Sequence, residues 1–369
     1  MKKVIALIMS LAMLAVIFSG CGSAAGTPSG EAATTVSGEA AATAPAESAA
    51  TAESTAAAPA SGDALKTGLG VVISLAKSAD AGDKDGLAET DAMVAAVLVD
   101  GAGKIVNCRI DAAQTKINFS KEGKLTTAKD AAFKTKQELG TEYGMGKASK
   151  IGKEWNEQAD AFATYVTGKT VDEVKGIAVS AEGVATAADL TSSVTVHIGD
   201  FIAAVEKAVN NAQDLGAKTG DKLGLGISTS MGQSADFTAD AAGLAQAYSY
   251  YTASTFGADG KVTSCVIDAS QGNVNFDATG KITSDIKAAA QTKDEIKEGY
   301  GMKKASKIGK EWYEQAAAFA KYATGKSIDE VKGIAVDQGV ATAADLTSSV
   351  TIHIGDFQKV IEKASANAK

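Results

Sequence analysis

The sequence predicts an α+β protein with two tandem homologous domains, each an antiparallel sheet packed with helices, after a disordered tether. Three observations support this prediction. A long block of sequence occurs twice, at a spacing far longer than that of a solenoid repeat. In each copy, short apolar runs separated by turn residues come first, and patterns with a helical period follow. The hydrophobic fraction of 45% is sufficient for packed cores.

The N-terminus has the features of an exported lipoprotein. Residues 1–3 are positively charged, and residues 4–18 form an apolar run that is too short for a stable transmembrane helix. The run leads into Ser19-Gly20-Cys21, which resembles a bacterial lipobox. We expect residues 1–20 to be a signal peptide and Cys21 to carry acyl chains at the extracellular face of the cell membrane. An ordinary signal peptide with an incidental cysteine is the alternative.

Residues 21–63 are predicted to be a tether. After Cys21 the segment is rich in Ala, Ser and Thr and has no aromatic residue. Such a composition buries too little surface to offset the entropy of ordering the chain. Fully stretched, the segment reaches roughly 130 Å. We expect it to separate the folded part from the lipid surface.

The duplication sets the predicted domain boundaries. The block from Lys147 to Trp155 recurs from Lys304 to Trp312 at a spacing of 157 residues. Further matching blocks follow in the same order, so we predict one domain over residues 64–213 and a second over 214–369. Because each copy has a full set of elements, the two halves are expected to fold independently.

The strands come first in each copy. Residues 95–99 and 104–110 flank a turn and predict a hairpin, which residues 116–119 and a turn at 121–124 extend. Turns at 257–260 and 277–280 mark the same pattern in the second copy.

Helices follow the strands. Ile151, Trp155, Phe162 and Val166 fall on one helical face, and Gly168 ends that helix. Two further helices are predicted in each copy. The first starts at a capping box, Thr170-x-x-Glu173 or Ser327-x-x-Glu330, and the second has Asp200 or Asp356 as its N-cap.

Composition argues against several classes of function. The net charge is −8, and the only arginine is Arg109, so the side chains that grip nucleic acid are scarce. Two histidines and three cysteines leave few ligands for a soft metal, and no metal site is predicted. Cys108 and Cys265 occupy equivalent strand positions, and we expect buried free thiols, although an exported protein would tolerate a disulfide.

The most informative motif is a run of hydroxyl residues over 189–198, repeated over 345–354. It lies between an acid and the start of the last helix of each copy. Helix N-termini offer unpaired N–H groups that suit a phosphate. A strand with Thr–Ser hydrogen bonds leading into a capped helix is the simpler reading. His197 and His353, two residues after the last threonine, are candidates for contacts with an anionic ligand.

This motif resembles the attachment sequence of FMN-binding domains, Asp-x-x-Ser-Gly-Ala-Thr, in which the final threonine carries FMN as a phosphoester. Ser and Val replace the Gly and Ala of the common form in both copies. The resemblance implies covalent FMN on two threonines, with the acids and serines as supporting residues. The matching positions are Asp189, Ser192 and Thr195 in the first copy and Asp345, Ser348 and Thr351 in the second.

The whole chain resembles the flavin-carrying pheromone lipoproteins of Gram-positive extracellular electron transfer. The lipobox, the tether, the two copies and the segments 136–145 and 152–158 carry this resemblance together with the motif. It implies a lipid-anchored protein that an exported FMN transferase modifies. It also implies electron transfer from a membrane donor to extracellular acceptors such as ferric iron. Such a protein is an electron carrier more than a stand-alone enzyme.

Aromatic and thioether side chains near the repeated blocks are candidates for packing on the flavin ring, among them those of the segments Tyr143-Gly-Met145 and Tyr300-Gly-Met302. Tyr143 and Tyr300 are the preferred ones. Trp155 and Trp312 lie on the apolar stripe of a helix, where a core role is more common.

Two other functions compete with the electron carrier. One is a non-redox binding or adhesion lipoprotein whose duplicated domains recognise a wall polymer or a small solute. The other, a hydrolase, has less support, because the sequence shows neither a nucleophile elbow nor a metal signature.

Overall fold

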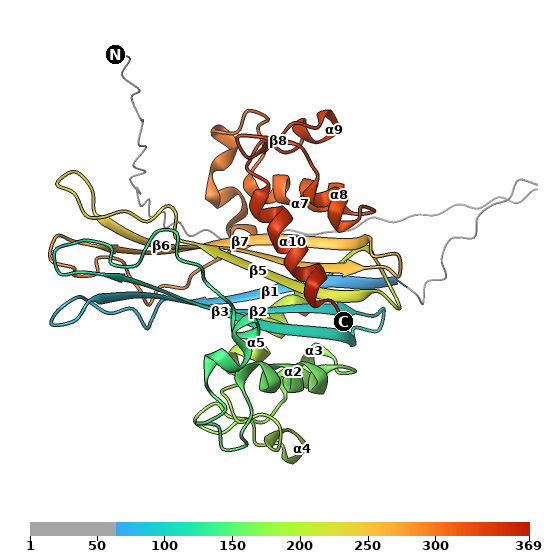
Figure 1. Cartoon of the computed structure of the whole chain (residues 1–369). Coiled ribbons are helices and arrows are strands. Elements are labelled where there is room, and N and C mark those ends of the chain that lie inside the picture. Colours follow the sequence, from blue (N-terminus) through green and yellow to red (C-terminus); the bar gives the residue numbers. More distant parts are fainter. Residues whose placement is uncertain (1–63) are drawn as a thin grey trace, which may run out of the picture. The chain divides into compact units, whose positions relative to one another are not determined.

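Two antiparallel sheets, one for each copy, lie face to face in the computed structural model, which describes residues 64–369 (Figure 1). The first sheet has the strand order β3-β2-β1-β4 and the second has the order β5-β6-β7. The predicted signal peptide, Cys21 and the tether lie outside the described residues. The strands are β1 (Ala64–Ser74), β2 (Gly86–Val99), β3 (Ile105–Phe119), β4 (Gln213–Lys218), β5 (Lys222–Ser230), β6 (Gly243–Phe256) and β7 (Val262–Phe276).

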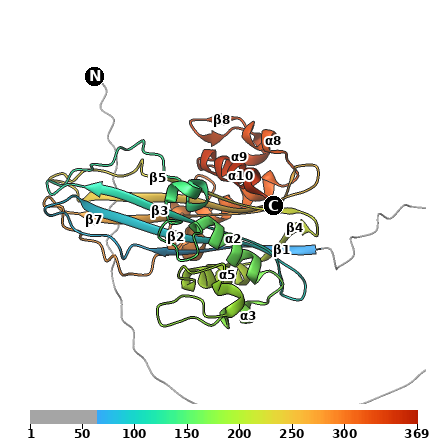
Figure 2. The same cartoon turned by 60° about the horizontal axis from the view of Figure 1, so that its bottom comes forward.

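Helices cover the outer face of each sheet. In the first copy, α5 packs on β1 and β2 while α2 packs on β3, and in the second copy α10 and α7 do the same on β5 to β7. Figures 1 and 2 show these two helical layers on opposite sides of the paired sheets. The helices are α1 (Lys136–Leu139), α2 (Trp155–Val166), α3 (Val171–Lys175), α4 (Ala188–Thr191), α5 (Gly199–Asn210), α6 (Lys293–Ile296), α7 (Trp312–Ala323), α8 (Ile328–Lys332), α9 (Ala344–Thr347) and α10 (Gly355–Asn367).

Smaller elements complete the described chain. Three short 3₁₀ helices follow α1 and α6, and a two-stranded ribbon lies before α9. Their bounds are η1 (Gly140–Tyr143), η2 (Lys297–Tyr300), η3 (Met302–Lys304), β8 (Val336–Asp337) and β9 (Val340–Ala341). No helix within residues 64–369 is both long and apolar enough to span a membrane. The two antiparallel sheets and the helices packed on them confirm the predicted α+β class.

The predicted hairpins are confirmed, but the strands are longer than expected. The turn at 100–103 joins β2 to β3, and the Asp100 carboxylate accepts the backbone N–H groups of Ala102 and Lys104, each at 2.9 Å. Residues 116–119 are the end of β3, which runs without a break from Ile105 to Phe119. The sequence analysis had not identified β1 or β5.

Both faces of each sheet are buried. Along β2, Ala95, Val97 and Val99 pack beneath the helices, while Val94 and Leu98 point into the core between the sheets. Side chains of adjacent residues point to opposite faces of a strand. A strand that is covered on both faces is therefore apolar without a break, as residues 94–99 are.

The core between the sheets joins the two copies. Leu69 and Val94 of the first sheet belong to the same buried cluster as Leu225 and Tyr251 of the second. Near one end of the sheets, the rings of Phe119 and Phe276 stack with centroids 4.3 Å apart. β4, which spans the predicted boundary between residues 213 and 214, pairs with β1 and completes the first sheet. This shared core argues against independent folding of the halves.

Glycines allow the last helix of each copy to lie directly on a strand. A Cβ atom at Gly226 of β5 would lie 1.9 Å from the carbonyl oxygen of Val360 in α10. At Gly70 of β1, it would lie 2.2 Å from the carbonyl oxygen of Ala204 in α5. These distances are shorter than any normal contact, so only glycine permits this packing.

We expect Gly226→Ala to lower the free energy of unfolding by about 3 kcal/mol or more, because helix and strand must move apart. Urea denaturation measures the effect. The control is Gly101→Ala, since a Cβ atom at Gly101 meets no atom within 4 Å. Equal stability of the two variants would contradict this account of the glycine.

The helix starts agree with the sequence in part. The capping boxes at Thr170 and Ser327 are confirmed. The expectation that Asp200 and Asp356 are N-caps is wrong, because Ile198 and Ile354 occupy those positions. Both aspartates lie in the first helical turn, where a negative charge interacts favourably with the helix dipole.

The expectation of buried free thiols is confirmed for the two cysteines in the described part of the chain. Cys108 lies in the core beneath the helices of the first copy, and Cys265 lies in the corresponding core of the second. Burial raises the pKa of Cys108 to about 12, which keeps the thiol protonated and unreactive.

Candidate functional site

The repeated hydroxyl motif forms a one-turn helix and a turn, so the simpler prediction of a strand is wrong. Asp189 lies in α4, Ser192 caps the C-terminal end of that helix, and Thr195 follows the turn. His197 then forms an isolated bridge with Val184 before α5 begins. The second copy repeats this arrangement through α9 and α10, with Asp345 in α9, Ser348 at its C-cap, Thr351 after the turn, and His353 in a bridge with Val340.

A buried glutamine holds the threonine of each motif. The Gln158 side-chain oxygen accepts the backbone N–H groups of Thr195 at 2.8 Å and Val196 at 3.2 Å. It also lies 3.2 Å from the Thr195 hydroxyl, as an acceptor. The side-chain nitrogen donates to Ser149 Oγ at 3.2 Å and to the Lys153 carbonyl at 3.1 Å. Gln158 thus connects α2, the loop before it and the motif.

The second copy has the same arrangement. Gln315 of α7 accepts the Thr351 N–H at 2.8 Å and the Thr351 hydroxyl at 3.3 Å. Its nitrogen donates to Ser306 Oγ and to the Lys310 carbonyl, each at 3.2 Å. Gln158 and Gln315 are both 0% exposed, whereas the two threonines are half-buried. The threonine hydroxyls are therefore held by buried partners, in residues that are themselves partly exposed to solvent.

Thr195 lines a cavity of about 550 Å³. Another cavity, of about 620 Å³, lies away from the motif, between β4, β7 and α7. Met145, Val184 and Val196 contribute apolar surface to the cavity beside Thr195, while Lys150 and Glu182 contribute opposite charges. The remaining lining residues are Ala148, Ser149, Gln158, Ser180 and Thr195. Cavities of 300–1,000 Å³ are typical of small-molecule sites. We take this cavity as the candidate site, because it includes the motif threonine.

The other residues predicted from the motif lie around the threonine without forming one cluster. Asp189 is exposed and lies beside Tyr165 of α2, where burial and then the Asp189 charge raise the pKa of Tyr165. Asp345 has the same place beside Tyr322, whose pKa is raised for the same reasons. Ser192, Ser348, His197 and His353 are exposed. Their proposed contacts with a ligand remain predictions.

The preferred aromatic residues lie next to lysines. Tyr143 is half-buried, and the Lys136 ammonium is 4.8 Å from its ring centroid and 5.1 Å from that of Trp155. Trp155 and Trp312 are 4% and 3% exposed, so their core role is confirmed. Met145, the other candidate of that segment, lines the cavity, whereas Tyr143 does not.

In the second copy, a buried lysine lies among aromatic rings. The Lys293 ammonium is 4.3 Å from the centroid of Tyr300, 4.5 Å from that of Tyr248 and 4.8 Å from that of Trp312. It also donates to the Tyr248 hydroxyl. Lys293 is 3% exposed, and burial lowers its pKa to about 7.

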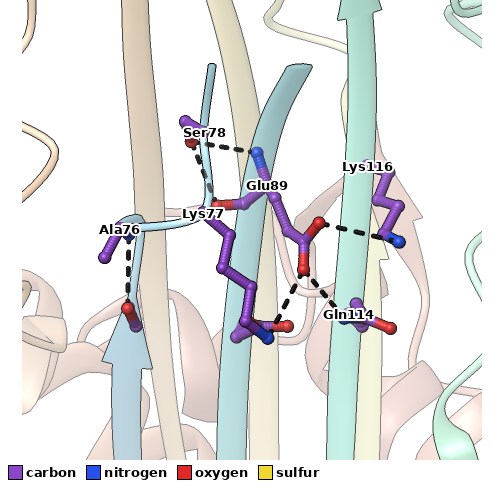
Figure 3. Close-up of polar contacts among 8 residues, drawn as sticks. Ala76, Lys77, Ser78, Glu89, Gln114 and Lys116 are labelled. Carbon is purple, nitrogen blue, oxygen red and sulfur yellow. Dashed lines mark hydrogen bonds and ion pairs between the residues drawn. The ribbon is translucent and has the colours of Figure 1, made fainter.

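The copies also differ on the sheet. In the first copy, the buried Glu89 carboxylate lies between Lys77 and Lys116 (Figure 3). The ammonium nitrogen of each lysine is 3.6 Å from a carboxylate oxygen, and Gln114 donates to the carboxylate at 2.8 Å. In the second copy, Gln246 pairs with Asn273 at 2.8 Å in the equivalent register. A charged cluster in one copy is thus an uncharged pair in the other.

Gln158 and Gln315 were not predicted as site residues, although the sequence held a signal for them. Gln158 lies three residues after Trp155 and four before Phe162, on the same buried face of α2. A polar side chain on such a face needs hydrogen-bond partners within the fold. The repetition of this glutamine in both copies pointed to a shared partner, which is the motif threonine.

No family model matches the chain, and no solved structure matches it. A stretch of 91 residues is 35% identical to a protein named chlorophenol reductase from Desulfitobacterium hafniense. The match covers 22% of this chain and 28% of that protein, so the chain spans only about a quarter of the length of this curated relative.

Proposed function

We propose that the protein is a membrane-anchored extracytoplasmic flavoprotein that carries FMN as a phosphoester on Thr195 and Thr351 and transfers electrons. The observation that carries this proposal is the equivalent position of the two threonines against a buried glutamine. Each hydroxyl is held by a buried glutamine, and each threonine is half-buried at the same place in its copy. The resemblance of the motif to the attachment sequence of FMN-binding domains supplies the identity of the group.

The residues at the first site suit such a group. The cavity beside Thr195 offers the apolar surfaces of Met145, Val184 and Val196 for a flat ring, and Lys150 for a phosphate. When bound, the flavin would supply one- and two-electron redox chemistry. The chain itself would hold the group covalently, which prevents its loss outside the cell.

The remaining parts of the proposal rest on the sequence. Acyl chains on Cys21 would anchor the protein, and an exported FMN transferase would attach the cofactor. A membrane donor and extracellular acceptors such as ferric iron would be its redox partners. The stretch shared with a protein named chlorophenol reductase is compatible with a redox role, but it is too short to support a substrate.

Intact mass spectrometry tests the proposal on protein made in cells with an active exported FMN transferase. We expect two additions of FMN less water in the wild type, one in either Thr195→Ala or Thr351→Ala, and none in the double variant, because the ester needs the hydroxyl oxygen. Cells with the double variant should lose reduction of extracellular ferric iron.

Matched controls are Thr191→Ala and Thr347→Ala, which remove neighbouring hydroxyls of the same motif. Both variants should keep two flavins. A colourless, unmodified wild type from these cells would refute the proposal and favour a binding lipoprotein without a flavin.

A further inference from the structure

We propose that Gln158 and Gln315 are positioning residues that aim the threonine hydroxyls outward for modification, an inference that rests on the proposed function. Each glutamine contacts the acceptor threonine directly and is fully buried. Neither residue belongs to the hydroxyl motif, and each comes from a helix more than 30 positions earlier in the chain.

The hydrogen bonds fix which end of the Gln158 amide faces the threonine. The backbone N–H groups of Thr195 and Val196 can only donate, so the amide oxygen must face them. At the other end, the carbonyl of Lys153 can only accept, so it requires the NH₂ group. The amide orientation is thus determined at both ends.

This orientation determines the direction of the threonine hydroxyl. The amide oxygen carries no proton, so in the 3.2 Å contact the Thr195 hydroxyl is the donor. Its proton points inward to Gln158, and its lone pairs point away from the glutamine. The cavity beside Thr195 is where a phosphorus atom could approach those lone pairs. Orienting a reacting group in this way lowers the entropy cost of reaction.

Modification would break only one of these hydrogen bonds. The new bond joins the threonine oxygen to phosphorus, and the bond from phosphorus to the leaving nucleotide of an anhydride-activated flavin donor breaks. The hydroxyl proton passes to a base of the transferase. The ester oxygen has no proton left to donate to Gln158. The N–H groups of Thr195 and Val196 still donate to the Gln158 side-chain oxygen. The backbone therefore stays in place, and the side chain can turn into the cavity.

Gln158→Met and Gln315→Met test this inference, because methionine fills a similar volume but lacks the amide. We expect the rate of modification of Thr195 in Gln158→Met to fall about tenfold or more, with Thr351 of the same molecules modified at the wild-type rate. Gln315→Met should show the reverse. Peptide mass spectrometry over a time course with the transferase resolves the two sites.

The unaltered copy of each variant controls for export, transferase and flavin supply. Gln158→Glu keeps an acceptor for the two N–H groups and should recover part of the rate. Phe162→Leu, a change in the core on the same helix, controls for lost stability and should leave modification of Thr195 unchanged.

The possible outcomes separate the two proposals. Wild-type rates at Thr195 in Gln158→Met would overturn this inference and leave the proposed function intact. An equal loss of rate in Phe162→Leu and Gln158→Met would also overturn it, because stability alone would explain the effect. If the wild type acquires no flavin, both proposals are wrong.

Discussion

A chain that contains only one of the two copies is expected to fail as a folded monomer. The core between the sheets would be open to water on one side, exposing Leu69 and Val94 in the first half or Leu225 and Tyr251 in the second. Each of these side chains is at most 4% exposed in the intact protein. Burial of a large apolar side chain contributes about 1.5–3 kcal/mol, so losing several exceeds the net stability of a typical domain.

Segments 64–218 and 219–369 test this prediction when they are produced separately and together. The first segment keeps β4, which completes its sheet. Alone, each should self-associate or unfold without cooperativity in urea. Together they should form a one-to-one complex with a single transition. Two monomeric halves that each unfold cooperatively would contradict the prediction and restore the view of two independent domains.

The second large expected effect is a change of folding stability with pH that depends on Lys293. In the folded protein its pKa is about 7, against an ordinary value of 10.5, and burial is the main cause. Between these two values the unfolded chain binds a proton that the folded chain does not, so stability rises with pH. The rise that the lysine contributes corresponds to about 2 kcal/mol between pH 7 and pH 9.

Other groups give the opposite slope. Burial raises the pKa of Cys108 and Cys265 above the ordinary value of 9.0, so these thiols lower stability as pH rises from about 9. Burial raises the pKa of Asp111 and Asp268 to about 7, so their contribution to stability is lost as pH rises from about 4 to 7. Burial also raises the pKa of Tyr250 and Tyr251 to about 12, which lowers stability above about pH 10. A rise between pH 7 and 9 is therefore specific to the lysine.

Urea denaturation of the wild type and Lys293→Met at pH 7, 8 and 9 measures this effect. The wild type should become more stable across the series, and the variant should lose most of that gain. Lys136→Met, at the equivalent position of the first copy, is the matched control. An identical pH dependence in the wild type and Lys293→Met would show that the lysine is not held with a lowered pKa.

Local signals in the sequence were sufficient to predict much of the fold. The turn at 100–103 and the capping boxes at Thr170 and Ser327 depend on residues close together in the chain, and these predictions were confirmed. The pairing of the two sheets was not predicted, because an apolar run such as 94–99 does not reveal what covers each of its faces. Long-range pairing depends on shape as well as on hydrophobicity.

The candidate site shows the same limit. The motif threonines could be singled out from a local pattern, but their hydrogen-bond partners could not. Gln158 and Thr195 are 37 positions apart, and only the docking of α2 against the motif brings them together. The predicted N-cap at Asp200 was wrong for a related reason. Ile198 is fully buried, and its place in the core sets where α5 begins.

The helical layers on opposite sides of the paired sheets affect how redox partners would meet the protein (Figure 2). Thr195 belongs to one layer and Thr351 to the other. Under the proposed function, a donor and an acceptor could be engaged at the same time without competing for one docking face. A large, immobile acceptor would also find a flavin on whichever side the carrier presented. Duplication would then reduce how far the carrier must rotate before one of its flavins faces a redox partner.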